Sequence, residues 1–115
     1  MIFKQKTNNK YHNEKVVVDG IRFDSIKEAK RYRELNLLVR AGEISDLELQ
    51  KEFVLIPNQY INGKLTERAV KYKADFVYKD KGNTVVEDTK GLKTDVYKLK
   101  KKLMLYVHGI RIQEI

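Results

Sequence analysis

The stretch that most constrains the fold is residues 70–90, VKYKADFVYKDKGNTVVEDTK. Its composition predicts two strands, rich in valine and aromatic residues, that are separated by the turn sequence DKGN. A β-hairpin centred on Lys81 and Gly82 would set Asp75 directly opposite Asp88. Opposed side chains lie roughly 5 Å apart, a distance at which two carboxylates repel each other. The stretch therefore predicts a hairpin that carries a pair of acids.

Two opposed carboxylates need a cation between them, or a shared proton, to offset their repulsion. Lys90 follows Asp88 by two residues and would share its strand face. Such a set suits metal-dependent cleavage of a phosphodiester bond. A shift of one residue in register would instead put Glu87 in the place of Asp88. A solvated strand face of alternating charges is the alternative, although apolar residues on both faces favour a strand covered on both sides.

The charge balance of the chain favours a polyanionic partner. Its 115 residues suit one domain with a modest core, and they carry a formal net charge of +8. Such an excess of lysine and arginine is typical of proteins that bind nucleic acid or an anionic surface. It gives no indication of sequence specificity, because contacts to phosphate carry none. A basic protein without a polyanionic partner is the alternative.

Metal-binding residues other than acids are scarce in this sequence. The chain has no cysteine, which excludes disulfides, thiolate zinc sites and cysteine nucleophiles. Its histidines, His12 and His108, are far apart, so a histidine zinc site is not expected. Any metal would bind oxygen ligands, which favours Mg²⁺ or Mn²⁺. The sequence shows neither a signal peptide nor an apolar stretch that could span a membrane, and we expect a cytoplasmic protein.

The N-terminal region divides into a basic arm, residues 1–14, and the start of a folded domain, residues 15–115. The arm is polar, and we interpret it as a loose segment that is either disordered or wrapped on a partner. Asp19 and Gly20 separate two short apolar runs, a pattern typical of a tight β-hairpin. The domain is therefore predicted to begin with a short hairpin.

A helix is predicted to begin after Ser25 and to end at Gly42. Ser25 and Glu28 have the spacing of a capping box, in which the serine hydroxyl accepts a hydrogen bond from the glutamate amide. Glu28 also lies on the apolar stripe of the helix, together with Tyr32, Leu35 and Val39. Two interpretations of Glu28, which do not exclude each other, stay open: an acid of the capping box, or a third carboxylate directed toward the hairpin site, which the stripe geometry favours.

The middle of the chain is predicted to be a connection, residues 43–52, followed by a strand at residues 53–56. On spacing alone, Gln50 is an ordinary loop residue just before that strand. Asn62 and Gly63 mark a second turn, which would link the strand to the central hairpin.

The C-terminal region is predicted to hold a second helix capped by Thr94 and a final strand at residues 110–115. The helix has one apolar stripe, formed by Val96, Leu99, Leu103, Tyr106 and Val107. Several lysines lie off the stripe or at the helix start: Lys93, Lys98, Lys101 and Lys102. They either cover a solvated helix face or contact a nucleic acid backbone. His108 is predicted to cap the helix end rather than to bind metal.

These elements predict a single-domain α/β fold with a mixed β-sheet and flanking helices, preceded by the N-terminal hairpin. The order helix, three strands, helix, strand resembles the restriction-endonuclease-like core of the PD-(D/E)XK nuclease superfamily. The signature of that superfamily is an acid at the end of the second core strand and acid-x-Lys on the third. In this sequence the matching residues are Asp75, Asp88 and Lys90.

The likeness extends from about residue 21 to residue 115. Runs such as AVKYKADFVY and VVEDTKGLKT are similar to a small phage-associated family of uncharacterised domains placed in this superfamily. Two positions depart from the pattern, because Ala74 replaces the proline and Asp88 replaces the more usual glutamate. Glu87 adjoins Asp88, so either acid could be the second metal ligand. A glutamine before the first core strand recurs in transposase subunits of the superfamily, which implies a supporting role for Gln50.

The resemblance implies a Mg²⁺- or Mn²⁺-dependent DNA endonuclease in which Asp75, Asp88 and Glu28 hold the metal. Lys90 would orient or activate the attacking water and stabilise charge on the phosphate. The basic residues of the second helix would hold the DNA backbone. Holliday-junction resolvases in the superfamily usually act as homodimers, so a branched substrate and a homodimer are open alternatives. Two other classes are a non-catalytic nucleic-acid-binding module and a phage protein that binds a host or replication protein.

Overall fold

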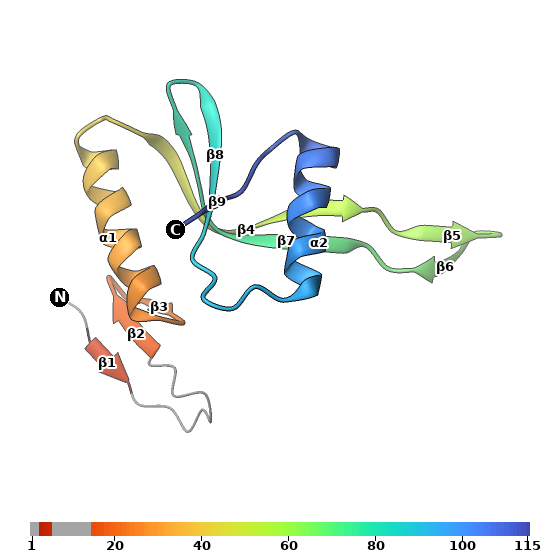
Figure 1. The fold of residues 1–115 in the computed structure, drawn as a ribbon, viewed down its shortest axis with the longest axis horizontal. Helices are drawn as coiled ribbons and strands as arrows, with labels where there is room; N and C mark the ends of the chain where they lie inside the picture. Colours follow the sequence, from red (N-terminus) through yellow and green to blue (C-terminus); the bar gives the residue numbers. More distant parts are fainter. Residues whose placement is uncertain (1–2, 6–14) are drawn as a thin grey trace. The chain divides into compact units, whose positions relative to one another are not determined.

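The computed structural model describes residues 3–5 and 15–115 (Figure 1). The chain forms two compact units, residues 1–44 and residues 45–115. It contains both helices and strands, and the larger sheet has both parallel and antiparallel neighbours, so the predicted mixed α/β class is confirmed. Most of the predicted basic arm, residues 1–14, lies outside the described residues; within it, β1 (Phe3–Gln5) is a short strand.

The first unit contains a small antiparallel sheet in the order β1-β2-β3. Strands β2 (Lys15–Val18) and β3 (Ile21–Phe23) are joined by Asp19 and Gly20, whose φ angles are 52° and 76°. Positive φ at both central residues defines a type I′ turn, which matches the twist of the two strands. The N-terminal hairpin predicted from the Asp-Gly pair is confirmed.

Helix α1 (Ile26–Arg40) begins and ends where the sequence predicts. Ser25 accepts a hydrogen bond of 3.1 Å at its Oγ from the Glu28 amide, and Gly42 follows the helix with a φ of 75°. The helix packs against β2 and β3, and the ring centroids of Tyr32 and Phe23 lie 5.1 Å apart. Its buried residues are Glu28, Ala29, Tyr32 and Leu35, which confirms most of the predicted stripe.

The second unit is built on a four-stranded sheet in the order β4-β7-β8-β9. Strands β8 and β9 are parallel, and the other neighbours are antiparallel. Beyond β4 and β7 the chain continues into a two-stranded hairpin, β5-β6 (Figure 1). The strands are β4 (Ser45–Ile56), β5 (Gln59–Ile61), β6 (Lys64–Glu67), β7 (Val70–Asp80), β8 (Asn83–Asp88) and β9 (Gln113–Glu114). The final strand is thus shorter than predicted.

Strand β4 corrects the prediction of a connection at residues 43–52. The strand begins at Ser45 and pairs with β7 along most of its length. Two of its residues, Asp46 and Gln50, have positive φ angles of 55° and 54°. These irregular positions break the strict alternation by which a strand is recognised in a sequence. Pairing with β7 nevertheless extends the strand, because the ladder satisfies backbone groups that an irregular loop would leave to water.

Helix α2 (Asp95–Leu103) has Thr94 as its N-cap, as predicted, and continues into the π-helical turn η1 (Met104–His108). The predicted apolar stripe is wrong as a packing face: Val96, Leu99 and Tyr106 are 63%, 58% and 88% exposed. The buried residues are Tyr97 and Met104. The face of α2 that carries Tyr97 is the one that packs on the sheet. The π-helical turn is wider than an α-helical turn, so it changes the angular spacing of the residues that follow α2.

The core of the second unit lies between α2 and one face of the sheet. It contains Leu55, Tyr72, Ala74, Val77, Val86, Tyr97, Met104 and Ile112. His108 lies at its edge, where Nε2 is 2.7 Å from the Val54 carbonyl oxygen and the ring makes an edge contact with Phe53. In the described part of the chain, no helix is long and apolar enough to cross a membrane.

Candidate functional site

The central hairpin has the predicted register. Val77 pairs with Val86 and Phe76 with Glu87, so Asp75 and Asp88 are the next two positions beyond the ladder. The turn residues, Lys81 and Gly82, have φ angles of 51° and 82°, again a type I′ turn. The turn fixes the register locally, which explains why the sequence was sufficient to predict it.

Strand β7 loses its strict alternation at Asp75. Tyr72, Ala74 and Val77 all belong to the core beneath α2. Strict alternation, counted back from Val77, would place Asp75 and not Ala74 on that face of the sheet. Across the β4-β7 pair, Gln50 has its positive φ of 54° at the position opposite Asp75. Both strands are therefore irregular at the same point, which is where the predicted site lies.

Asp75 is held against the segment that follows β8. Its Oδ2 accepts two hydrogen bonds from Thr89, one from the backbone amide and one from the hydroxyl, both 2.8 Å long. Its Oδ1 lies 3.4 Å from the Gln50 side-chain nitrogen. The carboxylate is half-buried. These contacts bring Gln50 into the site, as the resemblance implied, and they orient the Asp75 carboxylate.

Asp88 is completely buried. Its Oδ2 accepts a hydrogen bond of 2.6 Å from the Tyr72 hydroxyl, and its Oδ1 accepts one of 3.0 Å from the Lys90 backbone amide. Burial raises the pKa of Asp88 above its ordinary value and repulsion from Asp75 adds to this, while the Tyr72 hydrogen bond and Lys90 lower it. The ionised carboxylate is thus in a costly environment that a nearby cation would relieve.

The tyrosines around Asp88 act as neutral hydrogen-bond donors. Burial is the main reason that the pKa values of Tyr72 and Tyr97 are raised, and their carboxylate partners raise them further. The Tyr97 hydroxyl donates to Glu114 at 3.0 Å, and the Lys90 Nζ lies 5.7 Å from the centroid of the Tyr97 ring. Lys90 is exposed, and its charge interacts with Asp88. The structure therefore brings Asp75, Asp88 and Lys90 together.

Glu87 faces away from this cluster. Alternation along β8 directs it to the other face of the sheet from Asp88. It is buried there, and its Oε2 accepts a hydrogen bond from the Tyr78 hydroxyl. Of the two adjacent acids, Asp88 is the one that lies beside Asp75.

Glu28 belongs to the first unit. Its side chain is buried on α1, and its backbone amide is capped by Ser25. The Ser25 half of the predicted capping box is therefore confirmed. Its role as a third metal ligand stays a prediction.

The predicted nucleic-acid-binding lysines have two kinds of surroundings, and Lys101 belongs to both. Lys93 and Lys101 both approach Glu114 Oε1, at 3.6 Å and 2.7 Å, and the Lys101 hydrogen bond is the main reason that the pKa of Glu114 is lowered. Lys98, Lys101 and Lys102 line a pocket of 460 Å³ on the surface of α2, together with Leu105 and Arg111. The structure thus adds Arg111 to the predicted basic surface.

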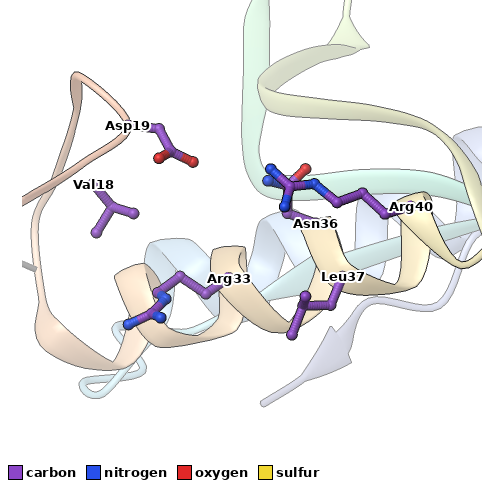
Figure 2. Close-up of a pocket in the computed structure, with 6 residues that line it drawn as sticks. All are labelled: Val18, Asp19, Arg33, Asn36, Leu37 and Arg40. Atoms are coloured by element: carbon purple, nitrogen blue, oxygen red, sulfur yellow. The ribbon is translucent and has the colours of Figure 1, made fainter. Parts of the chain in front are cut away.

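A second pocket, of 220 Å³, lies beside Asp88 and was not predicted. It is lined by Tyr72, Lys73, Lys90, Thr94, Val96, Tyr97 and Lys100. Tyr72 and Tyr97 reach the site from β7 and α2, and nothing in the local pattern distinguishes them from ordinary core tyrosines. The first unit has a separate pocket of 180 Å³ (Figure 2), where Asp19 lies with Arg33 and Arg40.

The chemistry of the site fits a hard divalent cation. Among the described residues, no group of three or more His, Cys, Asp or Glu side chains could hold a metal ion. Mg²⁺, however, is commonly bound by only one or two carboxylates and keeps several waters. Asp75 and Asp88 supply two carboxylates, oriented by Thr89, Gln50 and Tyr72. The donor set consists of oxygen atoms alone, which suits Mg²⁺ or Mn²⁺.

The fold and the site define an α/β protein in which a half-buried carboxylate on β7 and a buried one at the end of β8 are neighbours, with a lysine just beyond β8. The family described as "Protein of unknown function (DUF1064)" matches residues 8–112, so the chain belongs to that family. None of the curated proteins and none of the solved structures matches the chain.

Proposed function

We propose that the protein is a Mg²⁺- or Mn²⁺-dependent endonuclease that hydrolyses phosphodiester bonds in DNA. The observation that supports this most directly is the neighbouring pair of Asp75 and Asp88, with the Lys90 charge close to the buried Asp88. A structural protein gains nothing from a buried carboxylate that is repelled by a second one, whereas a cation-binding site needs both.

The proposed roles follow from the contacts of each residue. Asp75 and Asp88 would hold the cation, and Thr89, Gln50 and Tyr72 keep the two carboxylates oriented for it. When bound, the cation would polarise the scissile phosphate and lower the pKa of the attacking water. Lys90 carries the positive charge that would stabilise the negative charge growing on the phosphate oxygens. Water adds to phosphorus, and the P–O bond to the leaving strand breaks.

The basic surface of α2 supports DNA as the substrate. Lys98, Lys102 and Arg111 lie in one pocket with Lys101, and lysine and arginine are the usual contacts to a nucleic acid backbone. We expect the protein to act in the cytoplasm, as its sequence predicts. A preference for four-way junctions would favour the homodimer that is usual for junction resolvases.

A cleavage assay tests this proposal. Labelled linear duplex, single-stranded DNA and a four-way junction are incubated with the purified chain in Mg²⁺, Mn²⁺ or EDTA. We expect metal-dependent cleavage that is lost in Asp88→Asn and retained in Glu87→Gln, which alters the neighbouring acid on the other face of the sheet. Cleavage that survives in both Asp75→Ala and Asp88→Asn would contradict the proposal.

The second candidate is a non-catalytic nucleic-acid-binding module, favoured by the pocket of basic residues on α2. It predicts DNA binding that depends on salt but not on Mg²⁺, Asp75 or Asp88. Binding without cleavage in every metal tested would select this candidate over the endonuclease.

A further inference from the structure

The unpredicted pocket beside Asp88 is basic. Three lysines line it, each from a different segment: Lys73 from β7, Lys90 from the loop after β8, and Lys100 from α2. Lys73 and Lys90 are exposed, and Lys100 is half-buried. Three ammonium groups around a space of 220 Å³ create a positive potential that favours an anion.

Two lysines of this pocket lack the ion pairs that Lys93 and Lys101 form. Neither Lys73 nor Lys100 forms an ion pair with any of the residues that the structure describes. Lys93 and Lys101, by contrast, share the carboxylate of Glu114. An anion bound by Lys73 and Lys100 would therefore displace no ion pair.

The pocket adjoins Asp88 through two of its lining residues. Tyr72 lines the pocket and donates its hydroxyl hydrogen bond to Asp88, and Lys90 lines it while its backbone amide donates to the same carboxylate. A ligand that binds at both places must carry at least two anionic groups, one for the carboxylate site and the next for the pocket. A polynucleotide strand has this property, because phosphates repeat along its backbone.

We propose that this pocket, formed around Lys73, Lys90 and Lys100, is a subsite for the phosphate next to the bond that is cut in a polynucleotide strand. The subsite rests on the proposed endonuclease function and specifies how the substrate is held. Lysine binds phosphate as a point charge and has no preference for a base.

The two tyrosines of the pocket add no sequence selectivity. Both tyrosine hydroxyls are already engaged, that of Tyr72 with Asp88 and that of Tyr97 with Glu114. Tyr97 is also only 3% exposed, so its ring cannot serve as a stacking platform for a base. The subsite therefore holds DNA of any sequence.

The test compares two double variants of the full chain. Lys73→Gln/Lys100→Gln removes two charges from the pocket, and Lys79→Gln/Lys81→Gln removes two exposed charges near the turn between β7 and β8. The affinity for a labelled DNA strand of mixed sequence is measured in EDTA at several salt concentrations. Cleavage in Mg²⁺ is measured on the same preparations, so that binding and catalysis are judged separately.

We expect the pocket variant to bind DNA about tenfold more weakly at low salt. Its plot of log affinity against log salt should be shallower by about 0.7, because one phosphate contact on a single strand contributes roughly 0.7 to that slope. The control variant should bind like the wild type. Equal affinity and slope in the two variants would overturn the subsite, and so would binding of inorganic phosphate without binding of DNA. A pocket effect in a chain that never cuts DNA would instead refute the endonuclease and leave the pocket as a binding site for a backbone phosphate only.

Discussion

The hydrogen bond from Tyr72 to Asp88 offers the sharpest test of the site, because the chain contains a matched control. Tyr72 is 2% exposed and donates to Asp88 Oδ2 at 2.6 Å. On the other face of the sheet, Tyr78 is 8% exposed and donates to the buried carboxylate of Glu87. Tyr72→Phe and Tyr78→Phe therefore remove the same chemical group from the same kind of partner.

The magnitude follows from the burial of the acceptor. A hydrogen bond to a charged group is worth about 1.5–3 kcal/mol, and its loss leaves a buried oxygen of Asp88 without its donor. We expect each variant to lower the free energy of unfolding by about that amount at pH 7. Only Tyr72→Phe should also weaken Mg²⁺ binding, by roughly 10–100-fold, which is typical when a group that orients a metal ligand is lost.

Urea unfolding with and without Mg²⁺ measures both effects. A bound cation raises the free energy of unfolding with its concentration, so the gain at fixed Mg²⁺ reports its affinity. The gain should persist in Tyr78→Phe and shrink in Tyr72→Phe. The Tyr72 hydrogen bond lowers the pKa of Asp88, so the gain that remains in Tyr72→Phe should also require a higher pH. An equal Mg²⁺ gain in both variants would refute the assignment of Asp88 as the metal ligand that Tyr72 orients.

Two further predictions concern the irregular strands and the buried acid. Since the pKa of Asp88 is raised in the folded chain, ionisation costs stability as the pH rises from its ordinary value of 3.8 through the folded value. Asp88→Asn should therefore have a higher free energy of unfolding than the wild type at pH 7 in EDTA, as measured by urea unfolding. A difference in that free energy that persists unchanged below pH 3.8 would contradict this. Glycine at Gln50 or at Asp46 should raise stability by about 1 kcal/mol through relief of positive φ. Only Gln50→Gly should slow cleavage, because Gln50, unlike Asp46, approaches Asp75. Equal rates in the two variants would argue against a role for Gln50.

Local chemistry accounts for the features that the sequence predicted correctly. The turns at Asp19-Gly20 and Lys81-Gly82 need positive φ at adjacent residues, and the sequence shows where such residues occur. The start of α1 depends on a hydrogen bond between residues three apart, Ser25 and Glu28. The Lys81-Gly82 turn also sets the register that leads to Asp75 and Asp88. The acids of the site could therefore be predicted from the sequence.

The sequence failed where the partner of a residue is distant. The length of β4 depends on its pairing with β7, and the buried face of α2 depends on which side chains the sheet accepts. Neither property is encoded in the periodicity of the segment itself. The charged residues of β4 therefore concealed its strand pattern, and the more apolar stripe of α2 was incorrectly predicted to be its buried face. Propensity and periodicity are weak where tertiary contacts select among several acceptable arrangements.

The sequence by itself determined the turns, the helix starts and the identity of the two acids, because each depends on residues that are neighbours or hairpin partners. Only the tertiary structure decided what surrounds those acids. Gln50 meets Asp75 across the β4-β7 pair, Tyr72 reaches Asp88 from β7, and Lys73 and Lys100 come from different elements to line one pocket. These contacts join residues on different strands and helices, and they form only when the strands have paired and α2 has packed on the sheet.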